Sequence, residues 1–396
     1  MKQGWTYKKL GEVCEILNGF AFQSKNYVPN GIRVIRITNV QKGYIEDKDP
    51  KFYPLETQSE LSRYLLKDGD LLLSLTGNVG RVAIIDNSYL PAYLNQRVAC
   101  IRIKKGKELD ISFLFHLLYS NKFEEDCIKS SKGAAQLNMS TVWLSSYPIP
   151  IPPLSEQQRI VERLDSAFAH IDELKANAEK QVNEARALFQ KALSKAMEPK
   201  EGWEEKTLKE VGLTQTGTTP SKNDKDNYGD YIPFIRPSEI DIDGSGRIEY
   251  NSEIKLSEKG VSNGRLFKAH SILMVCIGAT IGKVGFNTQD VSCNQQINIL
   301  TPELDDYKFI YYAMRENSFI DKVIKDGTSA QATLPIINKG KWEKLTINVP
   351  PLAEQQRIVA RLDSLSEKVR KYEEIQKKVI AECDNLKQAL LRKVFE

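Results

Sequence analysis

The sequence predicts an α+β protein with two similar mixed α/β domains, separated by two long helices that form an antiparallel coiled coil, in a pseudo-twofold internal repeat. Three observations predict this fold class. The chain repeats itself at an offset of 198 residues, each half opens with short apolar runs broken by Gly, Pro, Asn and Asp, and each half ends in some 40 residues without Gly or Pro. The expected domains are residues 1–154 and 199–352, and the expected helices are residues 155–198 and 353–396.

Length and composition fit two globular domains. A chain of 396 residues is too long for one ordinary core. Its 41% hydrophobic and 27% charged residues are typical of a globular protein in water, and no stretch approaches the roughly 20 apolar residues of a membrane span. The first residues lack the apolar core of an export signal, so we expect a cytoplasmic location. Because the net charge is only +4, a phosphate-binding face must come from local clustering of Lys and Arg.

The cysteines and histidines match neither a zinc site nor a disulfide framework. No two cysteines form a C-x-x-C pair, so we expect free thiols that are buried or incidental. His116 and His270 are expected to be structural, and His170 is expected to pack or to be exposed. The six cysteines are Cys14, Cys100, Cys127, Cys276, Cys293 and Cys383.

The repeat is strongest where each domain meets its helix. Residues 152–166 read PPLSEQQRIVERLDS, residues 350–364 read PPLAEQQRIVARLDS, and 13 of the 15 positions are identical. The same offset aligns Gly4-Trp5 with Gly202-Trp203, so both halves open alike. The polar loops between these landmarks differ. Two related recognition domains that bind different targets would show this pattern. A plain duplication whose copies diverged without a change of role would show it as well.

Short β-rich runs dominate the first 150 or so residues of each half. At 32–37 and 98–103 apolar residues alternate with Arg, which indicates half-buried strands with a basic outer face. Helical stretches interrupt the strands at 111–119 and 308–315. A mixed α/β domain is therefore expected in each half.

The segments 155–197 and 353–395 predict helices of roughly 60 Å, too long to fold alone. In each, apolar residues follow the alternating steps of three and four that mark a coiled-coil seam. Because one helix leads into the second domain and the other follows it, antiparallel packing would relate the domains by a pseudo-twofold axis, a symmetry that duplex DNA shares. The expected packing residues are Leu164, Ile171, Leu174 and Leu188 in the first helix, and Leu362, Leu365, Val369, Tyr372, Val379, Leu386 and Leu390 in the second.

The two helix starts are expected to differ in strength. Ser155 and Gln158, three residues apart, match a capping box, and Pro152-Pro153 just before them prevents an earlier start. Ala353 replaces the serine in the second copy. We therefore expect the second helix to begin less firmly than the first.

The order of domain, PPLxEQQRIV helix, domain and helix resembles the specificity subunit of type I restriction-modification systems over essentially the whole chain. Its strongest marks are residues 153–161 and 351–359, with the Gly-Trp openings at 4–5 and 202–203. The one departure, Ala353 in place of Ser155, affects only a helix cap. The loops Gly80-Arg81 and Gly282-Lys283 and the pairs Asn95-Gln96 and Asn294-Gln295 also fit the family.

The resemblance implies that each domain is a target recognition domain, which reads one half of a split, asymmetric target in double-stranded DNA, and that helix length sets the unread spacer. It also implies a complex with two copies of a methyltransferase (modification) subunit and, optionally, with restriction subunits. No cofactor is then expected in this chain, because S-adenosylmethionine, ATP and Mg would lie on those partners. Catalysis would lie on the partners as well.

No motif for chemistry stands out. Residues 278–284 superficially match a P-loop, but three residues instead of four separate the glycines, and valine stands where magnesium needs Ser or Thr. No N-P-P-Y or D-P-P-Y tetrapeptide for amino-group methylation appears, and scattered acids such as Asp68 and Asp70 lack metal-ligand spacing. We expect no catalytic, cofactor-binding or metal-binding residue, and interpret the glycine loops as tight turns that present Arg81 and Lys283.

Base reading uses Arg for guanine and Asn or Gln for adenine, while Lys, Ser and Thr position the backbone. Four loop clusters supply such side chains in each half. The Asn-Gln pairs occur in both halves and are expected to be structural or to bind phosphate, whereas the divergent residues are better candidates for specificity. The candidates are Arg33, Arg36, Asn39, Thr76, Asn78, Arg81, Asn95, Gln96, Arg97, Lys132 and Gln136 in the first half, and Arg236, Thr280, Lys283, Asn294, Gln295, Gln296, Ser329 and Gln331 in the second.

A DNA specificity subunit, not itself an enzyme, is the leading interpretation, and three others stay open. One is an orphan or type II-like specificity subunit that serves only a methyltransferase. Another is a self-sufficient DNA enzyme, against which the missing motifs weigh. The third is a coiled-coil protein adaptor without DNA readout, which salt-dependent, sequence-selective DNA binding would eliminate.

Overall fold

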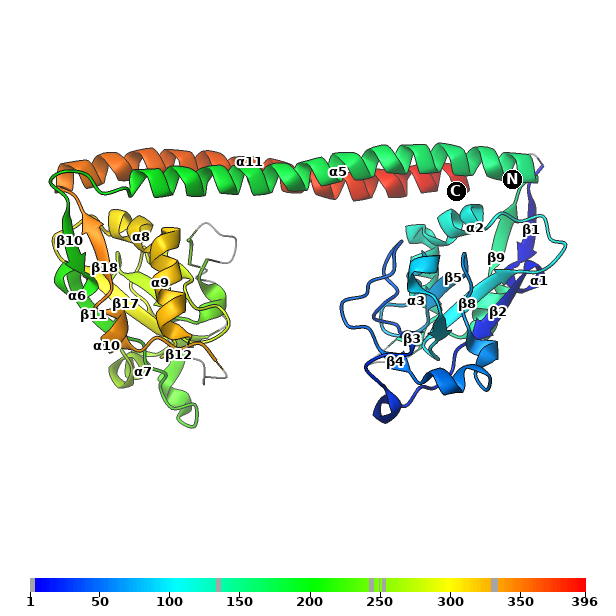
Figure 1. Cartoon of the computed structure of the whole chain (residues 1–396), viewed down its shortest axis with the longest axis horizontal. Coiled ribbons are helices and arrows are strands. Elements are labelled where there is room, and N and C mark those ends of the chain that lie inside the picture. The colour runs from blue at the N-terminus through cyan, green and yellow to red at the C-terminus, as the bar shows by residue number, and fades with distance from the viewer. Residues whose placement is uncertain (1–3, 133–136, 242–245, 249, 251–253, 329–333) are drawn as a thin grey trace. The chain divides into compact units, whose positions relative to one another are not determined.

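The computed structural model describes residues 4–132, 137–241, 246–248, 250, 254–328 and 334–396. The chain divides into two compact units: unit 1 is Met1–Asn177 with Val379–Glu396, and unit 2 is Ala178–Lys378. Each unit contains one β-rich domain and parts of both long helices, α5 (Leu154–Ala196) and α11 (Leu352–Phe395) (Figure 1). The domain boundaries expected from the sequence are drawn differently, because they separate each long helix from its globular domain. Those boundaries stay a prediction.

Three sheets build the globular part of unit 1. Strands β2-β8-β5-β6 form an antiparallel sheet, β4-β3-β7 form a second sheet in which β3 and β7 are parallel, and β1 pairs with β9. The β1-β9 pair joins the start of the domain to its end. The elements are β1 (Thr6–Lys9), α1 (Leu10–Val13), β2 (Cys14–Asn18), β3 (Ile32–Ile35), β4 (Phe52–Tyr53), β5 (Leu71–Ser74), β6 (Val82–Ile84), β7 (Ala92–Leu94), β8 (Val98–Ile103), α2 (Ile111–Leu118), α3 (Asn121–Ser130), α4 (Thr141–Ser146) and β9 (Pro148–Ile151).

Unit 2 repeats this topology. Its sheets are β11-β17-β14-β15, β13-β12-β16 with β12 and β16 parallel, and the pair β10-β18. The predicted α+β class with a repeated domain is confirmed. The elements are β10 (Glu204–Thr207), α6 (Leu208–Val211), β11 (Gly212–Thr216), β12 (Tyr228–Ile235), β13 (Lys255–Leu256), α7 (Glu258–Asn263), β14 (Ile272–Val275), β15 (Val284–Phe286), β16 (Ser292–Cys293), β17 (Ile297–Pro302), α8 (Tyr307–Arg315), α9 (Asn317–Gly327), α10 (Lys339–Trp342) and β18 (Thr346–Val349).

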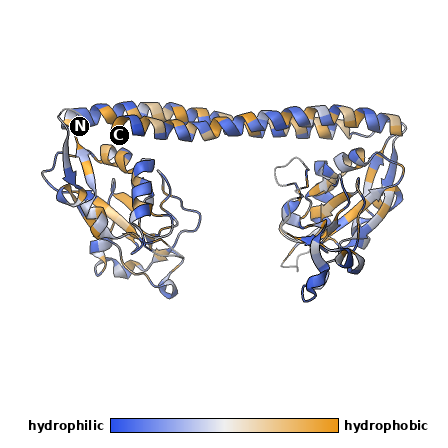
Figure 2. Ribbon diagram, turned by 180° about the vertical axis from the view of Figure 1, so that it is seen from behind, coloured by the Kyte–Doolittle hydropathy of each residue, from blue (hydrophilic) through white to orange (hydrophobic). Residues whose placement is uncertain are grey.

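The four-stranded sheet of unit 1 is buried on both faces. Along β8, Ala99 and Ile101 belong to the core beneath α2, whereas Val98 and Cys100 belong to the core shared with the three-stranded sheet. Figure 2 shows these strands mostly in the hydrophobic colour. The prediction of a basic outer face is therefore wrong for β8. This strand pairs with a neighbour on each side and is covered on both faces, so only its end, at Arg102, can place a charge near solvent.

A buried glutamine fastens the start of each long helix to its own domain. In unit 1 the Gln157 side chain accepts the backbone N–H of Asp110 at 2.8 Å and donates to the carbonyl of Pro152 at 2.8 Å. Asp110 is the N-cap of α2. Gln157 is 0% exposed, so the glutamine satisfies the buried Pro152 carbonyl and the half-buried N–H of Asp110 from inside the fold.

Unit 2 contains the same fastening. Gln355, which is 1% exposed, accepts the N–H of Asp306 at 2.8 Å and donates to the carbonyl of Pro350 at 2.9 Å. Asp306 is the N-cap of α8, the counterpart of α2. The repeated Glu-Gln-Gln sequence is thus a structural signature, in which the middle residue does the fastening.

About two turns further along each long helix, an aspartate eight residues after the glutamine provides a second link. In unit 1, His116 Nε2 lies 2.7 Å from Asp165 Oδ1, and burial of the ring lowers the histidine's pKa. In unit 2 the Tyr312 hydroxyl donates to Asp363 at 2.7 Å. His116 is 2% exposed and packs as a structural residue, as expected, while His270 stacks on Tyr307 with ring centroids 4.3 Å apart and His170 is exposed.

Within unit 1, α5 and α11 run antiparallel. Lys175 pairs with Asp384 at 2.9 Å and Asp172 with Lys387 at 2.5 Å, so rising numbers in one helix meet falling numbers in the other. The last turns of α11 also complete the core of the domain. Leu391 is 0% exposed in the same cluster as Leu10 and Phe113, and the Phe395 ring lies 5.5 Å from that of Phe113.

Within unit 2, the C-terminal half of α5 packs on the first turns of α11. Phe189 and Leu193 share a core with Leu362, and Arg186 pairs with Glu373 at 2.8 Å. Residues near the C-terminal end of α5 therefore contact residues near the N-terminal end of α11, so the two helices are antiparallel in this unit as well.

The seam between the helices differs in part from the expected one. Leu164, Ile171 and Leu362 are buried, and Leu365, Val369 and Leu390 are partly buried against the cores. In a coiled coil, the next packing residue lies three or four positions after a seam residue. In α5 it lies four positions later in two turns, where Phe168 and Phe189 are buried. The expected residues that are instead exposed are Leu174 (56%), Leu188 (61%), Tyr372 (38%), Val379 (38%) and Leu386 (49%).

The helix starts also differ from expectation. α5 begins at Leu154 and α11 at Leu352, so Ser155 and Ala353 each occupy the second helical residue and neither is an N-cap. The expected capping box at Ser155 is therefore wrong, and the serine-to-alanine difference does not separate the two starts. The two proline-rich segments enter both helices alike.

All six cysteines are free and buried, as expected. Burial raises the pKa of Cys14 and of Cys276 to about 12, so neither forms a reactive thiolate near neutral pH. Over the residues that the structure describes, no helix is both long and apolar enough to cross a membrane.

We predict that Gln157→Leu lowers the free energy of unfolding by about 3 kcal/mol, because the buried Pro152 carbonyl and the half-buried Asp110 N–H would each lose their partner, at about 1–3 kcal/mol each. Urea denaturation followed by circular dichroism measures this change. The neighbour Gln158 is exposed, so Gln158→Leu is the matched control and should stay within about 0.5 kcal/mol. Equal losses in the two variants would contradict the fastening role, and Gln355→Leu against Gln356→Leu repeats the comparison in unit 2.

Candidate nucleic-acid interface

In unit 1, three of the predicted loop clusters meet at one end of the four-stranded sheet. The N–H of Leu75, just after β5, donates to the carbonyl of Arg97 at 2.9 Å. On the other side, the N–H of Met139 donates to the carbonyl of Leu75 at 2.8 Å, and that of Gly77 to the carbonyl of Leu137 at 2.9 Å. The loop after β5 therefore lies between the Asn-Gln loop and the segment that leads into α4.

The fourth cluster, which follows β3, adjoins the same place. The N–H of Asn95 donates to the carbonyl of Ile35 at 3.2 Å, and the Arg81 guanidinium donates to the Gln41 side chain. The structure thus brings all four predicted clusters of unit 1 to one edge, which we call the loop edge.

Unit 2 has the same loop edge. The N–H of Cys276 donates to the carbonyl of Gln296 at 2.8 Å, and that of Gly278 to the carbonyl of Pro335 at 3.0 Å. The N–H of Asn294 donates to the carbonyl of Ile235 at 3.2 Å. The loop hydrogen bonds of unit 1 therefore have counterparts in unit 2.

The glycines of these loops adopt conformations that other residues rarely take. Gly77 and Gly80 have φ of 67° and 83°, and Gly278 and Gly282 have φ of 104° and 92°. The loop in unit 2 leads into β15 and not into a helix, so it lacks the helix N-terminus that a P-loop places against phosphate. The loops are tight turns, as expected.

Three of the predicted asparagines are occupied in holding the loops. Asn39, which is 5% exposed, accepts the N–H of Arg36 at 2.9 Å and donates to the carbonyl of Glu46 at 2.7 Å. Asn95 Oδ1 accepts the N–H of Arg97 at 3.1 Å, and Asn294 Oδ1 accepts the N–H of Gln296 at 3.1 Å. The asparagines of the two Asn-Gln pairs are therefore turn residues, which explains why both halves contain them.

The arginine within β3 and those just after β3 and β12 face carboxylates. Arg33 pairs with Asp47, and Arg36 pairs with Asp49 at 3.3 Å. Hydrogen bonds from Lys51 and Arg36 lower the pKa of Asp49, which keeps that carboxylate charged. In unit 2, Arg236 pairs with Glu239 at 2.6 Å. These arginines would have to exchange partners to contact a nucleic acid.

The exposed candidates form a smaller set. Thr76, Arg81, Lys283 and Gln296 are half-buried at the loop edges. Gln295 is exposed and accepts the Thr219 hydroxyl at 2.6 Å. Gln136, Ser329 and Gln331 lie outside the described residues. The remaining exposed candidates are Asn78, Gln96, Arg97 and Lys132 in unit 1 and Thr280 in unit 2.

Three loop-edge residues, Asn138, Ile277 and Ile336, were missed by the sequence reasoning. Asn138 forms a bridge with Thr76, and Ile336 forms the equivalent bridge with Ile277. Asn138 and Ile336 are separated by the 198-residue offset of the repeat, and that alignment is the signal that could have found this pair.

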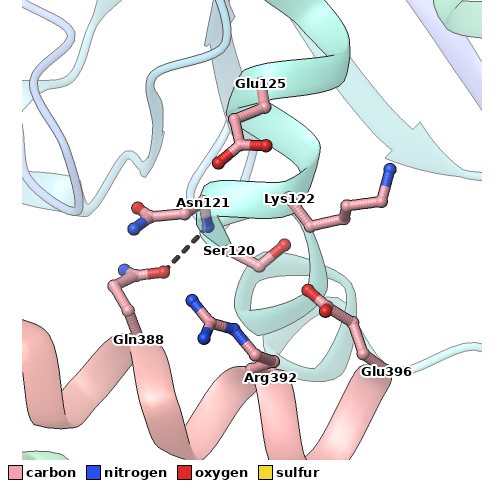
Figure 3. Close-up of a pocket in the computed structure, with 7 residues that line it drawn as sticks. All are labelled: Ser120, Asn121, Lys122, Glu125, Gln388, Arg392 and Glu396. Atoms are coloured by element: carbon pink, nitrogen blue, oxygen red, sulfur yellow. Dashed lines mark hydrogen bonds between the residues drawn. The ribbon is translucent and has the colours of Figure 1, made fainter.

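A polar cavity of about 300 Å³ lies elsewhere in unit 1, between the start of α3 and the end of α11. The backbone N–H of Asn121 donates to Gln388 Oε1 at 2.8 Å across it (Figure 3). Two cations and two carboxylates line it, so its charges balance. Among the described residues, no group of three or more His, Cys, Asp or Glu is placed to hold a metal ion. The cavity is lined by Ser120, Asn121, Lys122, Glu125, Gln388, Arg392 and Glu396.

Comparison with known proteins matches this repeated architecture to one family. The family model described as "Type I restriction modification DNA specificity domain" matches residues 2–184 and again residues 200–380. The EcoBI specificity subunit of Escherichia coli is 25% identical over 436 aligned positions, which cover 99% of this chain and 85% of that protein. The MjaVIII specificity subunit of Methanocaldococcus jannaschii is 32% identical over 188 residues, which cover 46% of this chain and 44% of that protein.

Solved structures show the same fold. A chain from a study of complex assembly and conformational transition in the type I R-M system covers 100% of this chain and 98% of its own length, with a TM-score of 0.70 and 22% identity. The HsdS subunit of Thermoanaerobacter tengcongensis covers 100% and 97%, with a TM-score of 0.50 and 20% identity. With two matches to the family model over most of its length, the chain belongs to the DNA specificity subunits of type I restriction-modification systems.

Proposed function

We propose that this chain reads a bipartite, asymmetric DNA target, one half-site with each unit, and directs methyltransferase and restriction subunits to it. The observation that carries the proposal is the loop edge, which occurs twice with the same backbone hydrogen bonds and different exposed side chains. The shared backbone of the loop edges would let both units dock on a duplex in the same way. The different exposed side chains would let each unit read its own bases.

The exposed polar residues of the loop edges have the chemistry for this role. Arg97 and Gln96 lie side by side in unit 1, and arginine reads guanine while glutamine reads adenine. Lys132 adds a cation that can neutralise phosphate. In this proposal the chain itself catalyses nothing, and S-adenosylmethionine, ATP and Mg²⁺ are bound by the partner subunits.

Each unit also carries an exposed apolar pair on its long helices, which we assign to the methyltransferase partner. In unit 1, Leu174 is 56% and Leu386 is 49% exposed, and the ion pairs of this unit place them opposite one another. In unit 2, Leu188 is 61% and Tyr372 is 38% exposed, beside the Arg186–Glu373 pair. Exposed leucines on a helix pair favour a protein partner.

The two apolar pairs are related by the internal repeat. Leu174 aligns with Tyr372 and Leu188 aligns with Leu386 at the 198-residue offset. Each unit therefore offers an equivalent surface made of one residue from each helix. Equivalent surfaces bind equivalent partners, which supports two copies of the methyltransferase subunit for each chain.

The apolar pairs predict a stepwise loss of stoichiometry. The double variant Leu174→Ser with Leu386→Ser should leave one bound methyltransferase subunit, and adding Leu188→Ser with Tyr372→Ser should leave none, because each change removes one apolar contact surface. Native mass spectrometry of the complex counts the copies. Leu304→Ser, at a residue that is 87% exposed in unit 2, is the control and should keep two. Two copies in the quadruple variant would refute the assignment.

We predict that the two residues of the Asn-Gln pair in unit 1 have different roles, one in stability and one in DNA binding. Asn95→Ala should lower the free energy of unfolding by about 1 kcal/mol, because the turn loses its side-chain hydrogen bond. Gln96→Ala should leave stability within about 0.5 kcal/mol and weaken DNA binding by the complex roughly 3- to 10-fold. Denaturation and DNA titration at a fixed salt concentration measure the two effects. Unchanged DNA affinity in Gln96→Ala would remove this residue from the interface.

The methylome of a host that lacks other DNA methylation tests the proposed function. We expect a split motif with methylated adenine when the chain and its methyltransferase subunit are expressed together, and no motif with either alone. DNA binding by the purified complex should weaken steeply between 50 and 200 mM salt, as for proteins that neutralise phosphates. A folded complex that yields no motif and binds DNA without sequence preference would refute DNA reading.

A further inference from the structure

One position of the loop edge has the same backbone contacts in both units and opposite side-chain chemistry. In unit 1, Thr76 and Asn138 are bridge partners. The Gly77-to-Leu137 hydrogen bond of 2.9 Å lies on one side of the bridge, and the Met139 N–H donates to the residue before Thr76 at 2.8 Å on the other. Two polar side chains therefore occupy this position in unit 1.

In unit 2, Ile277 and Ile336 are the bridge partners. The Gly278 N–H donates to Pro335 at 3.0 Å, and the Ile337 N–H donates to the residue before Ile277 at 3.0 Å. Two residues after Asn138 and Ile336, the N-caps Ser140 and Asn338 start α4 and α10. The two positions are thus structurally equivalent, and a polar pair in one unit is an apolar pair in the other.

The polar pair of unit 1 has unused hydrogen-bonding capacity. Among the described residues, the buried Oγ1 of Thr76 has no hydrogen-bond partner. Asn138 is exposed, and its carbonyl accepts the N–H of Lys132, a cation at the same edge. A buried hydroxyl without a partner is costly, so this position is not packed as a closed core. Asn138, the exposed member of the pair, is the residue whose amide can hydrogen-bond to a ligand with polar edges.

The apolar pair of unit 2 belongs to an exposed apolar surface. Ile336 is 49% exposed, Leu334 is 52% exposed, and Ile324 on α9 is 40% exposed. The Ile336 N–H donates to the carbonyl of Gly327, at the end of α9, at 2.8 Å, so the segment that contains Ile336 is in contact with this helix. Isoleucine cannot bind phosphate. The C5-methyl group of thymine is the apolar group that the major groove offers to such a side chain.

We propose that this position determines how the half-sites of the two units differ: Ile277 and Ile336 select a thymine through its methyl group, and Asn138, the bridge partner of Thr76, hydrogen-bonds to a base edge, with adenine favoured. The inference rests on the proposed function. Residues present at the loop edges of both units, such as Gln96 and its counterpart Gln295, make similar contacts in each half-site and cannot distinguish them. A position that changes from polar to apolar can.

The methyl group can be tested without altering the protein. Once the methylome has given the motif, each thymine of the unit 2 half-site is replaced by deoxyuridine, which removes only the methyl group, in duplexes bound by the wild-type complex. We expect one replacement to weaken binding roughly 5-fold or more. Equal affinity for thymine and deoxyuridine at every position of that half-site would overturn the proposal.

A reciprocal exchange tests the assignment to these residues. The double variant Ile277→Thr with Ile336→Asn, in the full chain with its methyltransferase subunits, should change one base of the unit 2 half-site and leave the other half-site unchanged. Its affinity should no longer distinguish thymine from deoxyuridine. Leu304→Asn, which alters an exposed apolar residue elsewhere in unit 2, is the matched control and should keep the original motif.

The outcomes separate the inference from the function on which it rests. If the wild-type complex produces no split motif, the proposed function fails. If it produces one and the exchanged variant produces the same motif, the inference alone fails. If the exchanged variant loses its methyltransferase subunits while still folded, the apolar surface belongs to a protein contact and the inference is also overturned. A variant that does not fold leaves the deoxyuridine measurement to decide.

Discussion

The arrangement of each unit depends on one buried glutamine. Gln157 and Gln355 each join a proline-rich strand end, the first turn of a long helix and the N-cap of a domain helix through hydrogen bonds of 2.8–2.9 Å. Because all three segments meet at a single side chain, the direction in which the long helix leaves the domain is fixed at its first turn. The aspartate links to His116 and Tyr312 then hold the helix against the domain further along.

This construction separates the frame of the protein from its reading surface. The fastening residues lie where the domain meets the helices, whereas the loop edges lie at an end of the central sheet, with turns held by glycines and asparagines. Side chains that are exposed at the loop edges support no core. They can change without loss of stability, which explains why the repeat keeps its frame and diverges in its polar loops.

The sequence predicted the features that depend on strong local patterns. The repeat, the strand at Val98–Ile103 and the two long helices all follow from identity or periodicity over many residues. The prediction of the packing residues failed where two different residues of a helix fit the same periodic pattern. Phe168 and Leu174 both fit a seam, and tertiary packing decides between them: His116 and Tyr119 of the domain cover the phenylalanine, whereas the leucine is 56% exposed.

The loop edges show a similar division between local and long-range information. The clusters could be identified from residue type, but the pairing of Asn138 with Thr76 depends on a backbone contact between segments some 60 residues apart in the chain. The occupation of Asn39, Arg33 and Arg36 by neighbouring groups likewise depends on how the loop after β3 folds back. Residue type gives the candidates, and tertiary contacts decide which of them remain free.

The participation of α11 in the core of unit 1 has a consequence for how the protein is made. Leu391 and Phe395 pack with Leu10 and Phe113, so the first domain to leave the ribosome lacks part of its interior until some 240 further residues have been synthesised. Unit 2, by contrast, is one continuous stretch of chain and is complete before those residues are added. Translation that stops early would release a chain whose second domain is finished and whose first still exposes apolar surface to chaperones and proteases.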